Sequence, residues 1–418
     1  MKLVKNEKVI DIMEKTLNHV DARLVDHGRR VAYLIYKVLE GQKKYDNKKM
    51  RDICILAMLH DVGAYKTEEI DKMVVFETVD VWEHSIYGYL FLKYFSPLKE
   101  MAPVILFHHA ECNELKYLEN QEHQMLAQLV SLCDRRDVFA LHGGNAESFK
   151  DYINQNRKIK YYDYIVDMFL ASELNIDNVF EGIDTDEAFN HVFRNTPLGK
   201  EEVDGYIKMI IYSIDFRSSQ TVIHTVATTC IAVIMAGLLG VGENDIETIR
   251  TGAMLHDIGK VGIPVNILES TDRLNDADME IMKKHVEITE KILHGNVDAD
   301  IKHIAINHHE KLDGTGYPKH CGVHDIAFFD RIVMIADIFS ALCGVRSYKT
   351  AYPKEKIIRI LGDMSCQNLI DPEIAALSIT HYDEIIEAVH RESLPVIQAY
   401  NDLNEEHQRI KNKINSIA

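Results

Sequence analysis

The stretch TGAMLHDIGK at residues 251–260 decides the fold, because it ends an apolar helix with a histidine and an aspartate side by side. Residues 53–64, ICILAMLHDVGA, repeat this arrangement. In both stretches a glycine follows two residues after the aspartate, where a helix is expected to end. Ligands at the ends of several helices can meet at one point inside a bundle. We therefore expect each stretch to help build a site inside an all-helical domain.

Each His-Asp pair belongs to a series of seven histidine and aspartate residues, and the series occurs twice in the same order. The first series is His27, His60, Asp61, His84, His108, His109 and Asp134. The second series is His224, His256, Asp257, His285, His308, His309 and Asp337. The steps from histidine to histidine and to the last aspartate, with each adjacent pair counted once, are 33, 24, 24 and 26 residues in the first series. They are 32, 29, 23 and 29 residues in the second, so the chain reads as a duplicated metal module.

The length and composition are those of a soluble globular protein with two or three domains. The chain has 418 residues, of which 46% are apolar and 27% charged. Its net charge of −18 argues against an extended basic surface for polymeric nucleic acid. A local basic pocket for a small phosphate ligand remains compatible with this charge.

The cysteines and the apolar runs indicate a cytoplasmic protein without a membrane partner. The seven cysteines are scattered and form no Cys-x-x-Cys pair, which suits free thiols in a reducing compartment. The N-terminus lacks the apolar stretch of a signal peptide. The longest apolar run, residues 230–242, is shorter than the roughly 20 residues that a membrane span needs.

The apolar periodicity predicts an all-α chain. Apolar residues recur at steps of three and four, as in Val31, Leu34, Ile35, Val38 and Leu39, and alternating strand patterns are scarce. The expected segments are a first module (1–140), a helical connector (141–214), a second module (215–365) and a C-terminal helical tail (366–418).

The ligand types predict the kind of metal. Imidazole and carboxylate together favour a first-row ion such as Fe, Mn, Co, Ni or Zn. Of these ions, Fe or Mn is the expected cofactor. Seven ligands suit two divalent ions better than one. Paired metals about 3.5–4 Å apart are the usual device for hydrolysing phosphate esters.

Three motifs of the second module resemble the signature of the HD-GYP family of cyclic dinucleotide phosphodiesterases. These are HDIGK at 256–260, HHE at 308–310 and DGTGYP at 313–318. The residues around Asp337 also fit, with RI at 331–332 and RSYK at 346–349. The wider HD superfamily of metal-dependent phosphohydrolases covers the first module. The resemblance implies two HD-type helical bundles in tandem, joined by the helical connector and followed by an amphipathic C-terminal helix.

The resemblance also implies roles for individual residues. The second series would bind a dinuclear centre, with Asp257 as bridging ligand and Lys260 contacting the scissile phosphate; these two are the expected catalytic residues. The expected substrate-binding residues are Lys260, Asp313, Gly316, Tyr317, Pro318, Arg331, Arg346 and Lys349. Two cations would offset the phosphodiester charge and lower the pKa of a bridging water.

The second module departs from the family pattern in two places. Its first ligand is followed by TVAT at 225–228, without the Arg-Val that usually follows this histidine, so one basic contact is missing. Some family members hold a third metal through a carboxylate one turn earlier, where this chain has Gln220. We therefore expect two metals.

The first module keeps the ligand types but loses their surroundings. Ala64 stands in the place of Lys260, and no Gly-Tyr-Pro loop follows His109, although HGRRV at 27–31 retains the basic pattern. We expect an additional metal here and a regulatory role. Independent phosphohydrolase activity is the alternative.

The C-terminal tail contains a heptad seam. Its members are Val396, Tyr400, Leu403, His407, Ile410, Ile414 and Ile417. The seam favours a homodimer and, equally, an amphipathic helix packed on its own domain.

The expected function is metal-dependent hydrolysis of a cyclic dinucleotide. Cyclic di-GMP, cleaved to linear pGpG and/or GMP, is the leading substrate, and 3′,3′-cyclic GMP-AMP is the alternative. A second function class is a catalytically weak module that binds metal or nucleotide and signals through the C-terminal helix. The intact lysine and loop favour the enzyme.

Overall fold

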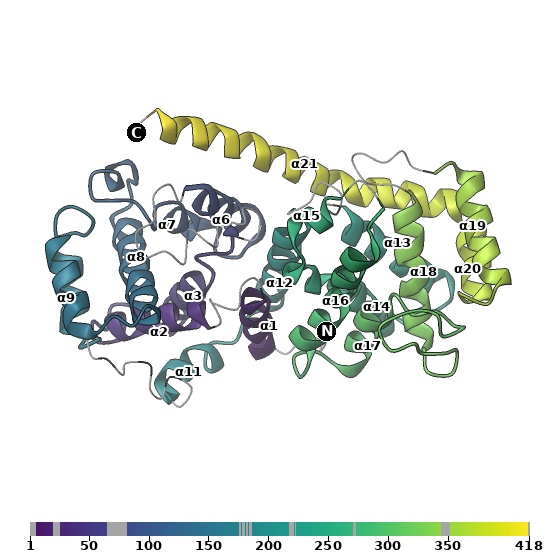
Figure 1. Ribbon diagram of the computed structural model, residues 1–418, viewed down its shortest axis with the longest axis horizontal. Coiled ribbons are helices and arrows are strands. Elements are labelled where there is room, and N and C mark those ends of the chain that lie inside the picture. Colours follow the sequence, from purple (N-terminus) through teal and green to yellow (C-terminus); the bar gives the residue numbers. More distant parts are fainter. Residues whose placement is uncertain are drawn as a thin grey trace. The chain divides into compact units, whose positions relative to one another are not determined.

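The computed structural model describes residues 6–19, 26–64, 82–174, 177, 180, 183, 186–216, 221, 223–270, 273–343 and 352–416. These residues form helices, turns and two isolated bridges (Figure 1). The predicted all-α fold is confirmed. Among the described residues, no helix has the length and apolar character that crossing a membrane would require.

The chain divides into two compact units, and neither unit is continuous in sequence. The N-terminal unit consists of Val9–Met209 and Leu403–Ala418. The C-terminal unit consists of Met1–Lys8 and Ile210–Asp402. Three helices cross the division: α1 (Asn6–Asn18), α12 (Lys200–Asp215) and α21 (Tyr382–Asn415).

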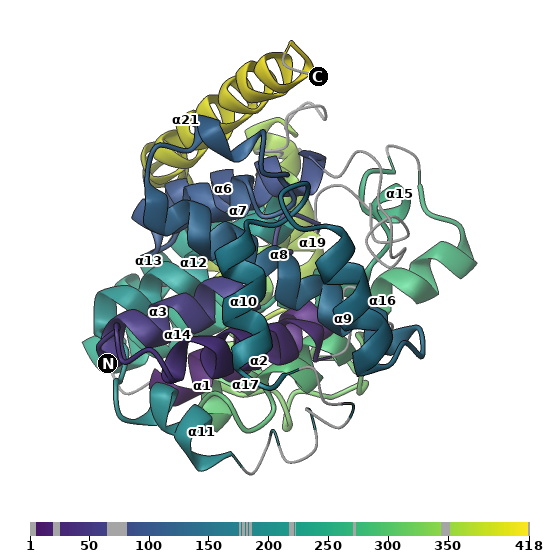
Figure 2. The same ribbon diagram turned by 90° about the vertical axis from the view of Figure 1, so that its left-hand side faces the viewer.

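Five helices build the centre of the N-terminal unit. They are α2 (His27–Glu40), α3 (Asn47–Met58), α6 (Trp82–Phe95), α7 (Ala102–Leu106) and α8 (Gln121–Leu141). The helix α2 packs on both α3 and α8, as Figure 2 shows, and α6 packs on α7. Two helix starts are fixed by side-chain caps, in which Asp46 accepts from an amide of α3 and Asn120 accepts from two amides of α8.

The residues expected to form a connector pack onto this unit. The segment contains α9 (Ala146–Gln155), α10 (Asp163–Ala171) and α11 (Glu187–Arg194). The helix α10 contacts α2 and α8, and α11 contacts α3. The buried Phe189 of α11 lies edge-on to Tyr33 of α2, with ring centroids 5.3 Å apart.

The C-terminal unit repeats the five-helix arrangement. Its corresponding helices are α13 (His224–Leu238), α14 (Glu243–Leu255), α16 (Asp276–Leu293), α17 (Ala299–Asn307) and α18 (Phe328–Cys343). The core lies between α13, α14 and α18, where fully buried Ile231, Ile249 and Ile335 pack together. Short elements complete the unit: η5 (Ile258–Gly262), α15 (Val265–Leu268), α19 (Lys354–Cys366) and α20 (Pro372–Thr380).

The C-terminal helix α21 belongs to both units. Its early residues Ile385 and Val389 lie in the core of the C-terminal unit. Its later residues Leu403 and His407 are buried in the N-terminal unit. The heptad seam therefore packs on its own chain over these residues, as one of the two sequence interpretations expected. A homodimer through this helix stays a prediction, and Ile417 lies outside the described residues.

Candidate metal centres

The seven ligand candidates of the C-terminal unit converge, and we call this cluster the C-terminal site. Its members are His224, His256, Asp257, His285, His308, His309 and Asp337. His224 begins α13, whereas His256 and His308 directly follow the last residues of α14 and α17. These helix-end positions bring residues that are far apart in sequence to one point. Six of the seven are buried, and His309 is partly exposed.

Asp257 lies in the middle of this cluster. Its Oδ2 atom is 3.1 Å from Nε2 of His256 and 3.6 Å from Nε2 of His224. Its Oδ1 atom is 3.5 Å from Nε2 of His285 and 3.9 Å from Nε2 of His308. One carboxylate thus presents each of its oxygens to a different pair of imidazoles.

Asp337 closes the other side of the C-terminal site. Its Oδ1 atom lies 3.0 Å from Nε2 of His224, and its Oδ2 atom lies 3.4 Å from Nδ1 of His309. The ligand atoms of His224, His256 and Asp257 lie within 4.8 Å of one another, as do those of His285, His308 and His309. The site therefore contains two groups, each able to hold one cation.

Backbone carbonyls fix the orientation of three of these rings. The Nδ1 atoms of His256, His285 and His308 lie 2.6, 2.6 and 2.7 Å from carbonyl oxygens three residues earlier. A carbonyl only accepts, so each Nδ1 carries the proton and each Nε2 presents a lone pair to the site.

Two buried polar atoms of the C-terminal site lack a hydrogen-bond partner among the described residues. They are Nε2 of His256 and Oδ1 of Asp257. The same Nε2 lies 3.1 Å from the other oxygen of Asp257. This pair attracts positive charge: burial lowers the pKa of His256, but Asp257 raises it to about 9. The residues present therefore fit divalent metal ions, as in HD domains.

Burial and neighbouring charges together set the pKa values of the cluster. Burial lowers the pKa of His285 to about 3 and lowers the pKa of His308 well below its usual value. Both rings are therefore neutral, as ligands must be. Burial alone would raise the pKa of Asp257, but the neighbouring His256 and Lys260 hold it well below its usual value. The cluster thus offers neutral imidazoles at His285 and His308 together with ionised carboxylates, whereas Asp257 raises the pKa of His256 to about 9 against the effect of burial.

The loop that contains Gly316, Tyr317 and Pro318 is anchored beside the site. The Tyr317 amide donates to the carbonyl of His309 at 3.1 Å, and the two rings lie 4.8 Å apart. A Cβ atom at Gly316 would stand 2.4 Å from the Cα atom of Glu310, so only glycine fits. The buried Glu310 carboxylate accepts from the amides of Lys319 and Cys321, at 2.7 and 3.0 Å. These contacts hold Tyr317 against the histidine cluster.

The other expected catalytic and substrate-binding residues occupy different places. Lys260, in η5, forms an ion pair with Asp257 through its Nζ atom. Asp313 is exposed and accepts from the amide and hydroxyl of Thr315. Arg331 donates to the carbonyls of Val323 and Ile326 and to the Asp371 carboxylate, so its guanidinium is engaged outside the cluster. Arg346, Lys349 and Gln220 lie outside the described residues.

The seven candidates of the N-terminal unit converge in the same pattern, and we call them the N-terminal site. Its members are His27, His60, Asp61, His84, His108, His109 and Asp134. Asp61 is again central, with Oδ2 3.2 Å from Nε2 of His60 and Oδ1 3.7 Å from Nε2 of His84. The Nε2 atoms of His60 and His108 are likewise buried without a hydrogen-bond partner among the described residues. This site also divides into two potential cation groups.

The HDxG glycine packs equally tightly in both units. A Cβ atom at Gly63 would stand 1.9 Å from the carbonyl oxygen of His84, and one at Gly259 would stand 1.9 Å from that of His285. The glycine therefore lets the histidine-aspartate turn touch the helix that carries the next histidine.

The two sites differ in what surrounds the ligands. In the N-terminal site, Nδ1 of His27 meets the Asp137 carboxylate, and Arg30 donates to the same carboxylate. Arg30, the basic residue that follows the first histidine, thus contacts a buried acid. In the C-terminal site, Ser340 stands at the position of Asp137 and Ala227 at the position of Arg30. The acid and its basic partner are thus both absent there.

Sequence reasoning missed Asp215, a buried carboxylate beside the C-terminal site. Its pKa is raised to about 7, mainly by burial and in part by the nearby Asp257, while Lys260 opposes the increase. Its Oδ2 atom has no hydrogen-bond partner among the described residues. The signal was present, because Asp215 is an acid at the end of the apolar run 206–216, shortly before the first ligand.

Comparisons with known proteins agree with this picture. HD domain models match residues 24–138 and 208–374. The chain is 35% identical to 3′3′-cGAMP-specific phosphodiesterase 2 of Vibrio cholerae over 45% of this chain and 37% of that protein. It is 24% identical to 3′3′-cGAMP-specific phosphodiesterase 1 of the same organism over 85% of this chain and 87% of that protein. It is 33% identical to a cyclic di-GMP phosphodiesterase of Thermotoga maritima over 43% of this chain and 49% of that protein.

The first and third of these relatives are matched over less than two thirds of their length. A solved structure of a cyclic GMP-AMP specific phosphodiesterase from V. cholerae aligns with 93% of this chain and 98% of its own chain. The TM-score is 0.55 and the sequence identity is 17%. This similarity concerns the fold. Together with the motifs and the two clusters, the matches confirm the resemblance: the chain contains two HD domains and is homologous to HD-GYP cyclic dinucleotide phosphodiesterases.

Proposed function

We propose that the C-terminal site hydrolyses a phosphodiester bond of a cyclic dinucleotide with the help of bound divalent metals. The observation that carries the proposal is the central Asp257, whose oxygens face four imidazoles while Lys260 stands beside it. Five histidines, two ionised carboxylates and one lysine supply metal ligands and a phosphate contact in one place. The names of the relatives support this reaction class.

Two divalent ions, Fe or Mn, are the proposed cofactors of this site. His224, His256 and Asp257 would hold one, and His285, His308 and His309 the other, with Asp337 beside both groups. When bound, such ions lower the pKa of a coordinated water and polarise the phosphate. Asp257 is the proposed bridging ligand because its two oxygens face different histidines.

Two side chains of the C-terminal unit are proposed to act on the substrate directly. Lys260 would exchange its ion pair with Asp257 for a contact with the scissile phosphate and stabilise the charge that develops there. Tyr317 would form a wall for a base or ribose, since its ring lies 4.8 Å from that of His309. Burial raises the pKa of Tyr317, so its hydroxyl stays protonated and can donate.

The N-terminal site is proposed to bind metal in a regulatory or supporting role. It has the same ligand types, but Ala64 is buried where the other site has Lys260. No segment equivalent to the Gly-Tyr-Pro loop follows His109 in the sequence. A site that holds metal without phosphate-binding groups meets only part of what catalysis needs.

Two substrates are candidates. Cyclic di-GMP is the substrate named for the Thermotoga relative, which matches mainly one module of this chain. The candidate 3′,3′-cyclic GMP-AMP is favoured by one observation: phosphodiesterase 1 of V. cholerae matches across 85% of this chain and so shares both modules. We retain both for testing.

The test is an assay of the purified full chain loaded anaerobically with Fe or Mn. Each cyclic dinucleotide is supplied separately, and the products are separated by chromatography to distinguish linear dinucleotide from mononucleotide. We expect turnover of at least one substrate, and none by the Asp257→Ala variant. Tight binding of both substrates without hydrolysis by the metal-loaded chain would instead favour the signalling module.

A further inference from the structure

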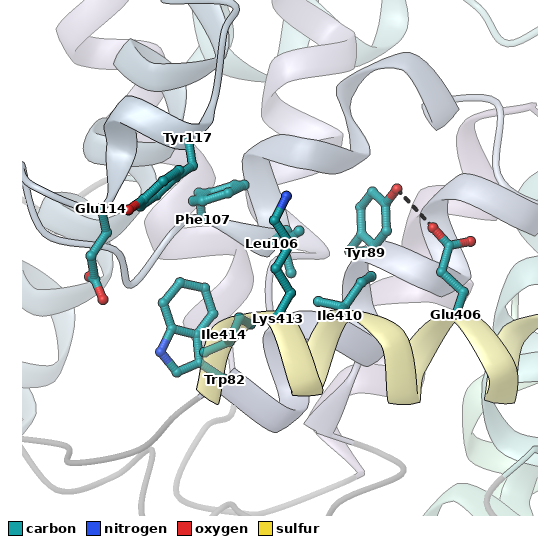
Figure 3. Close-up of a pocket in the computed structure, with 10 residues that line it drawn as sticks. All are labelled: Trp82, Tyr89, Leu106, Phe107, Glu114, Tyr117, Glu406, Ile410, Lys413 and Ile414. Atoms are coloured by element: carbon teal, nitrogen blue, oxygen red, sulfur yellow. Dashed lines mark hydrogen bonds between the residues drawn. The ribbon is translucent and has the colours of Figure 1, made fainter. Parts of the chain in front are cut away.

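A cavity lies in the N-terminal unit and is lined by none of the residues of the two histidine clusters. It has a volume of about 230 Å³ and opens between the last turns of α21 and the helices α6 and α7 (Figure 3). Neither the metal-ligand candidates nor the proposed substrate loop lines it. The cavity is therefore a separate site.

Aromatic rings form much of its wall. Trp82 and Tyr89 come from α6, Phe107 follows α7, and Tyr117 comes from the short helix η3 (Leu115–Tyr117). The rings of Trp82 and Phe107 stand perpendicular, with centroids 6.2 Å apart. Flat ring faces of this kind are the usual platforms for stacking a nucleobase.

The α21 side of the cavity carries one acid whose charge is already compensated. Glu406 accepts from Lys93 at 2.6 and 2.7 Å and from Tyr94 at 2.9 Å, and Tyr89 donates to it at 3.4 Å. Its carboxylate therefore fastens α21 to α6. It leaves little negative charge to repel an anion.

Lys413 lies seven residues after Glu406 on α21 and also lines the cavity. Its side chain extends from α21 toward α7 in Figure 3, and it forms no ion pair within the described part of the chain. On the opposite wall, Glu114 uses one carboxylate oxygen to accept from the amide of Glu111 at 2.8 Å. The cavity thus combines aromatic faces, a free ammonium group and a carboxylate acceptor.

We propose that this cavity binds a purine nucleotide. The base would stack on one of the aromatic rings and meet a second ring edge-on, because Trp82 and Phe107 are perpendicular. Its N–H groups would donate to Glu114, and its phosphate would meet the ammonium group of Lys413. Each of the three chemical features of the cavity then has a partner. The proposal goes beyond the proposed hydrolysis and does not depend on it.

The position of the cavity gives such binding a consequence for the N-terminal site. Trp82 lies two residues before His84, and Phe107 directly precedes His108. A nucleotide held there would tie the end of α21 to the two segments that carry these ligand candidates. The cavity is thus suited to regulation by a nucleotide.

The experiment uses a built-in reporter, because Trp82 is the single tryptophan of the chain. GMP, which has no diester bond, is titrated into the full chain while indole fluorescence is followed with excitation outside guanine absorption. We expect saturable quenching. Guanosine lacks the phosphate and ribose 5-phosphate lacks the base. Each should bind with an affinity at least about tenfold lower than that of GMP.

Variants separate the contributions. Lys413→Ala should weaken GMP binding about tenfold and leave guanosine binding unchanged, and Tyr117→Leu should weaken both. Both residues are exposed, so the fold should be retained. Lys150→Ala, an exposed lysine on α9, is the matched control, and Asp257→Ala should bind GMP as the parent does.

The proposal is overturned if GMP causes no saturable change, or if Lys413→Ala and Lys150→Ala bind it equally well. Equal affinity for guanosine and GMP would likewise overturn it, because the cavity would then recognise only an apolar ring. Loss of GMP binding in Asp257→Ala would assign the signal to the other site.

Discussion

The Nδ1 atom of His27 lies 2.6 Å from a carboxylate oxygen of Asp137, a residue one turn beyond the ligand candidate Asp134. Burial would lower the pKa of His27, but Asp134 and Asp137 raise it to about 10. In the C-terminal site the equivalent Nδ1 of His224 meets a hydroxyl, that of Ser340, at 2.9 Å, and burial lowers its pKa. A carboxylate behind a ligand histidine makes the ring a stronger donor to metal. The two sites should therefore hold metal with different strength.

The first prediction exchanges these partners. Asp137→Ser combined with Arg30→Ala gives the N-terminal site the surroundings found at Ser340 and Ala227. Its metal affinity should fall by roughly 10–100-fold, the usual effect of losing such a partner. Metal titration of the full chain, followed by elemental analysis, measures this. Ser340→Ala is the control for the other site, and unchanged affinity in the double variant would contradict the role of Asp137.

The second prediction concerns the division of labour between the sites. Asp257→Ala removes the central carboxylate of the C-terminal site, and Asp61→Ala removes its counterpart. Phosphodiesterase turnover should disappear in the first variant, whereas a substantial fraction should survive in the second. Steady-state rates under equal metal loading provide the comparison. Equal losses would show that both sites are needed for catalysis.

The third prediction concerns Lys260→Ala. If the ammonium group acts on the phosphate, the rate should fall by roughly a hundredfold or more while the metal content stays near that of the parent. Lys291→Ala, an exposed lysine on α16, is the matched control. Because Lys260 pairs with Asp257, metal loss together with rate loss would instead make it a structural partner of the site.

The fourth prediction tests the anchoring of the Tyr317 loop. Gly316→Ala forces a methyl group against the Glu310 backbone at 2.4 Å, so it should destabilise the fold by about 1–3 kcal/mol and weaken substrate binding. At Gly322 a Cβ atom would meet only the Leu312 carbonyl oxygen, at 3.9 Å. Gly322→Ala should therefore behave like the parent in thermal unfolding and in KM. Equal effects of the two substitutions would argue against the anchoring role.

The fifth prediction follows from the raised pKa of Asp215. Its ordinary pKa is 3.8 and burial raises it to about 7, so between these values the folded chain keeps a proton that the unfolded chain releases. The stability contributed by this proton is present at acid pH and is lost as the pH rises through this window. The Asp215→Asn side chain stays neutral throughout this range, so the variant should not lose stability in this way.

The measurement is thermal unfolding of the chelator-treated chain across this pH range. The Tm of Asp215→Asn should be close to that of the parent near pH 4 and should exceed it progressively toward pH 8. Asp245→Asn, an exposed aspartate on α14, supplies the control. Parallel Tm curves for Asp215→Asn and the parent would mean that Asp215 is ionised throughout.

Much of the fold was predictable because its signals are local. The spacing of apolar residues predicted helices, and the structure confirms an all-α chain. The repeated order of histidines and aspartates also predicted that His224 and Asp337 would meet, and their side chains lie 3.0 Å apart. Their function as metal ligands stays a prediction.

The rest depended on contacts that sequence spacing does not encode. Asp137 and His27 are 110 positions apart, and only the packing of α2 on α8 brings them together. The contact of Arg30 with that buried acid could not be predicted for the same reason. The heptad seam of α21 could not reveal whether its apolar face packs on its own chain or on a second copy, because both kinds of packing need the same apolar pattern.

The path of α21 has a practical consequence for dissecting this protein. Because Leu403 and His407 complete the N-terminal unit, a fragment that stops at residue 140 would expose the apolar surface they cover and lack both α21 and the residues of α10 and α11. Failure of such a fragment to fold would say nothing about its metal site. Placing residues 403–418 ahead of residue 9 would join the two segments of the N-terminal unit in one fragment that ends at residue 209, although it cuts the three helices that cross the division.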